Sequence, residues 1–509
     1  MESEQTHGRS RVIIVSNRLP IVLSKDENGQ WTVEPGSGGL VTAMAPVLRN
    51  RGGLWIGWPG NASEDGVDME PLLEKAAGES GYSLKPVALT RREVQEYYMG
   101  FSNEILWPLF HDFVPYCNFK PVYWKTYESV NKKFATVVQK NSSGRDFIWI
   151  HDYHLIGVAQ ELRKMGNASK LGFFLHIPFP PPDIFLKLPW RFQILHKLLA
   201  YDLVGFQTLR DRRNFVQCVR MLLKDVAIWG KGQVIRMRLN HREIRIGAFP
   251  ISIDYGEFSN LARTEAVAKK AWYIHENLPN MKIILGVDRL DYSKGIIEKL
   301  NAFRNALIRY PELQGRVVLA QILVPSRREI PMYATLKEQI ERLVGEINGQ
   351  FTHSGWVPIY YLFRNLDREE LVAHYRTAEI LLVTASKDGM NLVAKEYCAS
   401  NIEENGVVVL SEFAGVASQF HRNVILINPY DIEGVADALY KAYKMPREER
   451  RTHMHKLRQS IRKTDIYWWV NSFLLAAIAK RLDNFPIMEE YVPLYNEEEA
   501  EEKAAEGSL

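Results

Sequence analysis

The side chains best placed to do chemistry are two cations, Arg289 and Lys294, which stand five positions apart in the sequence. An apolar run at 283–285 precedes them and a helix-like stretch at 296–308 follows, so they lie in a loop between a strand and a helix. Such a loop in an α/β sheet offers free backbone N–H groups and the positive end of a helix to an anion. The loop therefore predicts a phosphate site, although Arg and Lys at this spacing also occur as ordinary solvated surface charge.

A second segment, residues 387–396, supplies hydrogen-bond acceptors after an apolar run at 380–383. Its Gly-containing loop leads into a helix whose N-terminus can hold phosphate oxygens. Asp388 on the loop can accept from sugar hydroxyls, and Glu396, about two turns into the helix, can accept from a ribose diol. Arg327, after another apolar run, adds a cation near the same sheet edge. Together these residues predict a nucleoside diphosphate site and group transfer from a nucleotide-activated donor.

Polar residues also follow strands in the first half of the chain. Arg18 ends the first apolar run, and Gly38-Gly39 allow close backbone approach to a ligand before an apolar helix start. Asp152 follows a later apolar run and His176 lies near the end of another, where they can face a crevice. Each also has a plainer interpretation, as a solvated arginine, a turn, a loop carboxylate or a core histidine.

The sequence predicts neither a metal nor a cofactor. His151, Asp152 and His154 are close together, but side chains at a strand end alternate between faces, so the first two point apart. No further His or carboxylate cluster with ligand spacing completes a site, and no DxD pair accompanies the Arg–Lys loop. The two cations can neutralise a leaving diphosphate without a metal ion.

Short apolar runs rich in Val and Ile must position these residues, and they predict strands buried on both faces. The runs lie at 12–15, 147–150, 171–177, 202–206, 283–287, 317–323, 380–383, 407–410 and 424–427. Stretches with helical periodicity, such as 327–347 and 367–378, lie between them. This alternation predicts an α/β fold of two Rossmann-like doubly wound domains that face each other across a crevice.

The length of 509 residues is too great for one ordinary core. We expect an N-terminal domain at 1–250 and a C-terminal nucleotide-sugar domain at 251–464. A helix at 465–485 contains two tryptophans, so we expect it to pack back on the first domain. Residues 486–509 are acidic and poor in apolar side chains, which predicts a disordered tail.

The composition excludes several classes of function. With 64 basic and 60 acidic residues the net charge is +4, too balanced to favour nucleic acid as a partner. The three cysteines are far apart and include no CxxC pair, so neither a disulfide framework nor a zinc knuckle is expected. The N-terminus is polar and no run approaches the roughly 18 apolar residues of a membrane span. We therefore expect a cytoplasmic protein without a membrane partner.

Several motifs together resemble those of one family, the trehalose-6-phosphate synthases. They appear in family order at 16–18, 38–40, 98–107, 149–154, 173–180, 289–295 and 388–396, and the resemblance covers residues 11–485. These proteins are retaining glycosyltransferases with two Rossmann-like domains, the GT-B architecture. The resemblance implies synthesis of α,α-trehalose 6-phosphate from a nucleotide glucose, usually UDP-glucose, and glucose 6-phosphate.

The resemblance also implies a donor site. Arg289 and Lys294 match the pair that grips the donor diphosphate, and His176 and Asp388 match the residues that hold the donor glucose. These four are the expected catalytic residues. Glu396 matches the residue on the ribose. The other donor positions lie in loops and at a helix start: Gly38, Gly39, Leu366, Leu392, Val393, Ala394 and Lys395. The position of Leu366, which is Phe in some relatives, meets the base through its backbone.

An acceptor site follows from the same resemblance. Four residues match the glucose 6-phosphate site, with the arginines on the phosphate: Arg18, Tyr98, Asp152 and Arg327. Two match positions that shape the pocket around the acceptor anomeric centre: Trp107 and Ile177. No motif places an obvious carboxylate nucleophile, so the implied route is a front-face transfer that retains the α configuration, with the departing phosphate oxygen helping to deprotonate the acceptor.

Two alternatives remain at this point. One is a glucosylglycerol-phosphate synthase, which keeps the donor site and takes glycerol 3-phosphate. The other is a non-catalytic paralogue that senses sugar phosphate, but such a chain should have lost donor-site residues that are present here. We expect dephosphorylation by a separate trehalose-phosphate phosphatase. The sequence leaves open UDP-, ADP- or GDP-glucose as donor, and the oligomeric state, including a homo-oligomer.

Overall fold

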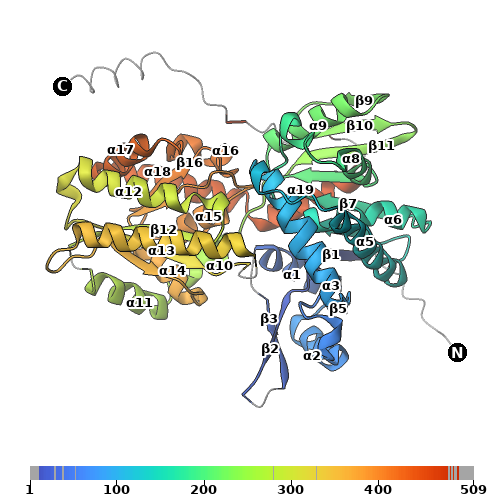
Figure 1. Cartoon of the computed structure of the whole chain (residues 1–509), viewed down its shortest axis with the longest axis horizontal. Helices are drawn as coiled ribbons and strands as arrows, with labels where there is room; N and C mark the ends of the chain where they lie inside the picture. Colours follow the sequence, from blue (N-terminus) through green and yellow to red (C-terminus); the bar gives the residue numbers. More distant parts are fainter. Residues whose placement is uncertain are drawn as a thin grey trace.

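The computed structural model describes residues 11–27, 30–36, 39–51, 53–278, 280–327, 330–479, 482, 485 and 490–491. Two α/β units lie side by side, the first drawn from blue to green and the second from yellow to orange (Figure 1). Each is built on its own sheet, and the strands of the first sheet all precede those of the second in the chain. Gly38 and nearly all of the predicted acidic tail lie outside the described residues.

The first sheet has nine strands in the order β5-β4-β1-β6-β7-β8-β11-β10-β9. Its strands are β1 (Val12–Arg18), β4 (Leu54–Trp58), β5 (Ser83–Pro86), β6 (Phe147–His151), β7 (Lys170–Phe174), β8 (Leu203–Phe206), β9 (Val226–Trp229), β10 (Val234–Leu239) and β11 (Arg242–Ala248). Pairing is parallel from β5 through β11, and β9 and β10 add an antiparallel edge. A separate hairpin joins β2 (Ile21–Lys25) to β3 (Trp31–Pro35).

The second sheet has six parallel strands in the order β14-β13-β12-β15-β16-β17. They are β12 (Lys282–Arg289), β13 (Val317–Val324), β14 (Ile359–Leu362), β15 (Ile380–Val383), β16 (Val407–Ser411) and β17 (Ile425–Ile427). Every apolar run singled out in the sequence forms a strand in one of the two sheets. The predicted α/β class is therefore confirmed, whereas the limits of the two domains stay a prediction.

The helices follow the strands as crossovers. In the first unit they are α1 (Gly39–Arg51), α2 (Met69–Ser80), α3 (Arg91–Glu93), a π-helix η2 (Val94–Leu106), α4 (Trp107–Phe110), α5 (Pro121–Asn141), α6 (Val158–Lys164), α7 (Pro182–Phe185), α8 (Arg191–Leu198) and α9 (Leu209–Leu222). In the second they are α10 (Tyr255–Leu261), α11 (Glu265–Glu276), α12 (Ile296–Arg309), α13 (Pro331–Phe351), α14 (Arg368–Thr377), α15 (Leu392–Ser400), α16 (Ala417–Phe420), α17 (Ile432–Lys444) and α18 (Arg447–Lys463).

The last described helix, α19 (Ile466–Ile478), returns to the first sheet, as its place in Figure 1 shows. Phe473 stacks on Trp149 of β6 with ring centroids 4.2 Å apart. A Cβ on Gly172 or Gly205 would come within 2.9 or 2.7 Å of the Phe473 ring, so these strand glycines make room for it. The indole of Trp469 donates to the Phe249 carbonyl at 3.1 Å.

Candidate active site

A cavity of about 580 Å³ lies between the two sheets and is lined by residues at or just after the carboxyl ends of their strands. The first unit contributes side chains that follow β1, β6 and β7, and the second contributes side chains that follow β12, β13 and β15. Ten of the predicted site residues line it: Arg18, Tyr98, Trp107, Asp152, His176, Ile177, Arg289, Lys294, Arg327 and Asp388. Crevices at the carboxyl ends of parallel strands are where α/β folds bind ligands.

The Arg–Lys loop forms one side of the cavity. Arg289 is the last residue of β12, is exposed, and has no carboxylate within ion-pair distance among the residues that the structure describes. The ammonium of Lys294 bonds the Asp388 carboxylate at 2.6 Å. Burial alone would raise the pKa of Asp388, but the charge of Lys294 and its hydrogen bond hold that pKa below the ordinary value.

Gly295 fixes the direction of this loop. Its φ of 60° is left-handed, and a Cβ there would lie 2.1 Å from the Thr384 carbonyl oxygen. Only glycine takes this conformation at this approach without strain. The 3₁₀ turn η5 (Tyr292–Lys294) before it is capped by Asp291, which accepts from the backbone N–H of Ser293 at 3.0 Å.

The side chain of Arg327, in the second unit, contacts the first unit. Its guanidinium forms a 2.9 Å ion pair with Asp291, and both side chains are nearly buried, at 8% and 1% exposure. The same group lies 3.9 Å from the Trp107 ring centroid, and Arg289 lies 5.7 Å from that ring. Trp107 therefore stands between cations of the second unit and the wall of the first, where an aromatic face attracts a guanidinium.

The opposite wall consists of imidazoles and a carboxylate. His176 Nε2 lies 3.1 Å from His151 Nδ1, and burial lowers the pKa of His176 to about 3. Asp152 accepts from the His176 backbone N–H at 3.2 Å, and burial raises the pKa of Asp152 to about 6. Asp152 has a φ of 75°, so the chain turns sharply where β6 ends. Near neutral pH this wall presents a neutral histidine beside a carboxylate.

The segment around Tyr98 is not an ordinary α-helix. Residues Val94–Leu106 form a π-helix, which then continues as α4 beginning at Trp107. π-Helical turns are rare and are common at functional sites because they redirect side chains. Tyr98 packs on Trp58 with centroids 5.7 Å apart, and the guanidinium of Arg18 lies 4.6 Å over that same indole. The π-helix thus brings Tyr98 beside Arg18.

The remaining predicted donor residues are not among those that line the cavity. Gly39 is the first residue of α1, whose neighbour Leu40 does line it. Leu366 follows β14, two strands from β12, and packs partly buried against the core. Leu392, Val393 and Ala394 form the first turn of α15. The Glu396 carboxylate accepts from the Tyr375 hydroxyl at 2.8 Å. Lys395 points elsewhere, to the carbonyl of Ile251 at 2.8 Å.

Three aromatic residues, His154, His111 and Trp55, are among the cavity residues that were not assigned from the sequence. His154 stacks on Tyr98, and neither of its buried ring nitrogens has a hydrogen-bond partner in the described part of the chain. His111 packs on Trp107 with centroids 4.2 Å apart. Trp55 donates to the Ser16 hydroxyl at 2.8 Å. His154 itself was considered only as a metal ligand, whereas nothing in the sequence pattern marked His111 or Trp55.

Among the described residues, no group of three or more His, Cys, Asp or Glu side chains has the geometry of a metal site. Within the same residues, no helix has the length and apolar character needed to cross a membrane.

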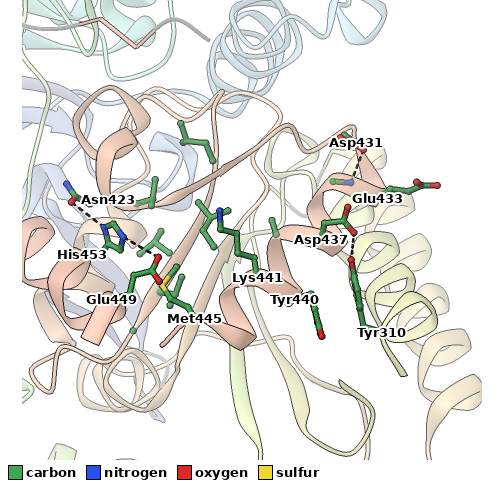
Figure 2. Close-up of a pocket in the computed structure, with 18 of the residues that line it drawn as sticks. Tyr310, Asn423, Asp431, Glu433, Asp437, Tyr440, Lys441, Met445, Glu449 and His453 are labelled. Atoms are coloured by element: carbon green, nitrogen blue, oxygen red, sulfur yellow. Dashed lines mark hydrogen bonds and ion pairs between the residues drawn. The ribbon is translucent and has the colours of Figure 1, made fainter. Parts of the chain in front are cut away.

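A larger cavity, of about 1110 Å³, lies against the amino-terminal part of β16 and edge strand β17, and Figure 2 shows its lining. Polar groups there contact one another: Tyr310 donates to Asp437 at 2.7 Å, and His453 lies between Asn423, at 3.4 Å, and Glu449, at 3.8 Å. Because it faces away from the carboxyl ends of the strands, the smaller cavity is the candidate active site.

Comparison with known proteins identifies the family to which the chain belongs. Residues 10–478 match the model of glycosyltransferase family 20. The chain is 41% identical over 483 residues to a trehalose-6-phosphate synthase of Mycobacterium leprae, covering 93% of this chain and 95% of that protein. It is 42% identical over 497 residues to one of Mycolicibacterium gilvum, covering 95% and 96%.

Solved structures give the same picture. An α,α-trehalose-phosphate synthase (UDP-forming) from Burkholderia xenovorans, in complex with glucose-6-phosphate, superposes with a TM-score of 0.82 at 34% identity, covering 92% of this chain and all of that one. An E. coli protein bound with UDP-2-fluoro glucose has a TM-score of 0.82 at 36% identity, covering 93% and 100%. These matches confirm the predicted GT-B arrangement and glycosyltransferase class. The chain belongs to glycosyltransferase family 20.

Proposed function

We propose that this protein transfers glucose from UDP-glucose to glucose 6-phosphate and forms α,α-trehalose 6-phosphate with retention of configuration. One observation carries the proposal. The cavity is lined by four cations, which we group into two sets, Arg289 with Lys294 and Arg18 with Arg327. Two phosphorylated substrates that must meet at one point require two such sets. The structures of relatives that hold glucose-6-phosphate and UDP-2-fluoro glucose support this pairing.

In the proposed donor site, Arg289 and Lys294 bind the diphosphate. Arg289 has no carboxylate partner in the described chain and is free to meet an anion, and Lys294 can exchange its bond to Asp388 for one to a phosphate. Asp388 and His176 then hold the glucose hydroxyls. Glu396 binds the ribose after exchanging its bond to Tyr375, while Leu366 and the start of α15 contact the rest of the nucleotide.

In the proposed acceptor site, Arg18 and Arg327 hold the 6-phosphate and Tyr98 packs beside it. Asp152 accepts from a sugar hydroxyl. Trp107 and Ile177, both 5% exposed, shape the space around the acceptor anomeric centre.

The proposed chemistry is a direct exchange on one face of the sugar. The bond from the donor anomeric carbon to the phosphate oxygen breaks as the bond to the acceptor O1 forms. The acceptor proton passes to the departing phosphate oxygen. Arg289 and Lys294 stabilise the charge that develops on the diphosphate, which is the usual role of fixed cations at a leaving group. No metal ion enters this scheme. Cytoplasmic location, a separate phosphatase and the oligomeric state stay predictions.

The test offers the purified protein UDP-, ADP- and GDP-glucose, each with glucose 6-phosphate or glycerol 3-phosphate. Products are identified by NMR, with a chelator added in a parallel set. We expect α,α-trehalose 6-phosphate from UDP-glucose and glucose 6-phosphate, with the rate unchanged by chelator. Preferential use of glycerol 3-phosphate would instead support the glucosylglycerol-phosphate alternative. Tight binding of sugar phosphate without any transfer would support the sensing paralogue.

A further inference from the structure

One short segment of backbone links the two sheets, and both units bond to it. We call residues 249–254, between β11 and α10, the connector. The backbone N–H of Ile251 donates to the Gln207 side chain of the first unit at 2.9 Å. The carbonyl of the same residue accepts from the Lys395 ammonium of the second unit at 2.8 Å. A single connector residue is therefore held from both sides.

Lys395 occupies this place at an energetic cost. Its side chain is 1% exposed, and within the described chain no carboxylate forms an ion pair with it. The other three buried lysines of the described chain have stronger partners. Lys299 pairs with Asp288, Lys294 pairs with Asp388, and Lys197 bonds Gln160 at 2.9 Å and Glu128 at 3.2 Å. A buried ammonium with only a carbonyl to bond is destabilising relative to an apolar side chain. Burial accordingly lowers the pKa of Lys395 to about 7.

A chain of contacts connects Lys395, through Ile251 and Gln207, to residues of the candidate active site. Gln207, which holds Ile251, also donates to the His176 carbonyl at 3.4 Å. That carbonyl lies against Gly389, where a Cβ would come within 2.2 Å of the oxygen. Gly389 belongs to the loop that leads into α15 and so back to Lys395. The contacts close a ring that passes through both units behind His176 and Asp388.

We propose that Lys395 is a positioning residue, whose ammonium ties α15 to the connector and so fixes the spacing between His176 and Asp388. The inference rests on the proposed function, because it assigns these two residues to opposite sides of one donor glucose. Misplacement by about 1 Å can cost a hundredfold in rate. A loosened crevice also admits water, which competes with the acceptor for the donor.

The test is Lys395→Met, which keeps the length of the side chain and removes the ammonium. We expect kcat to fall on the order of ten- to hundredfold. The ratio of UDP-glucose hydrolysed to glucose transferred should rise. A merely structural role would change stability but not this ratio. The matched control is Lys197→Met, which removes another buried ammonium away from the cavity and should leave kcat, KM and the ratio unchanged.

A second variant, Gln207→Met, breaks the same ring from the first unit. It should show the same rise in the hydrolysis ratio, and the double variant should be no worse than the poorer single one, because coupled contacts are not additive. A wild-type ratio in folded K395M overturns the proposal. If K395M does not fold, a wild-type ratio in Q207M overturns it. Failure of the proposed function is distinct, since the wild-type protein would then form no transfer product.

Discussion

The two cavities in this molecule differ in how far the charges that line them are paired, and their sizes do not reflect this difference. The larger, at about 1110 Å³, is lined by charges that largely satisfy one another at an exposed rim, as Arg309 does with Glu433 and Asp437, each at 3.1 Å. The smaller, at about 580 Å³, collects cations from both units, and Arg18 and Arg289 have no carboxylate partner in the described chain. Unmatched charge at strand ends, rather than volume, marks the smaller cavity as the candidate active site.

The strongest challenge to this comparison is Arg289→Ala. Loss of one charge contact at the leaving diphosphate should lower kcat/KM at least about a hundredfold. Steady-state rates measure it, with Arg309→Ala in the larger cavity as the matched control. Near-normal activity in R289A would show that the diphosphate binds elsewhere. An equal loss of kcat/KM in R309A would show that the two cavities do not differ in function.

Arg18→Ala should act on the acceptor alone. Loss of one charge-assisted hydrogen bond to the 6-phosphate should raise the KM for glucose 6-phosphate by about tenfold or more, with kcat and the donor KM little changed. Varying each substrate in turn separates these effects. An unchanged acceptor KM would show that the phosphate does not lie beside Trp58 and Tyr98.

A smaller effect is expected from the protonation of Asp152. Burial raises the pKa of this carboxyl from its ordinary 3.8 to about 6. One pH unit below its pKa only about a tenth of a carboxyl is ionised, so the acceptor KM should rise severalfold between pH 7 and pH 5. Between pH 3.8 and 6 the Asp152 carboxyl is more protonated in the folded state than in the unfolded state. Lowering the pH through this range therefore raises the free energy of unfolding through this group, while it weakens binding of the acceptor. Asp152→Asn should bind the acceptor poorly with a KM that no longer changes over this range.

The smallest effect is expected in the larger cavity. Glu433→Ala or Lys441→Ala should change the free energy of unfolding by about 0.5 kcal/mol or less and leave all kinetic constants as they are. Denaturant titration and steady-state assays check this. A shift in either KM would show that this cavity communicates with the active site.

Much of this arrangement follows from local sequence pattern. Runs such as residues 12–15 and 283–287 are buried on both faces, so their identity as strands is evident from composition alone. Because parallel strands present their carboxyl ends at one edge, Arg18 and Asp152 could be expected at that edge of the first sheet, and Arg289 at the same edge of the second, across the crevice.

Other features depend on contacts that no local pattern encodes. The π-helix at Val94–Leu106 keeps helical spacing in the sequence, so the wider turn that directs Tyr98 could not be predicted. The partner of Lys395, Ile251, lies 144 positions away, in a connector whose path the whole fold sets. The hairpin edge β9–β10 lacked strong apolar runs because its strands are only half buried.

Because α19 packs on the first sheet, the first unit cannot complete its packing until late in synthesis. Trp469 bonds a carbonyl 220 positions earlier in the chain, and Phe473 fills the space left by Gly172 and Gly205. Because synthesis runs from the N-terminus, the face of the first sheet around Trp149 is complete only when nearly all of residues 1–478 have emerged. A nascent first half thus carries an apolar face that needs protection until the last helix arrives.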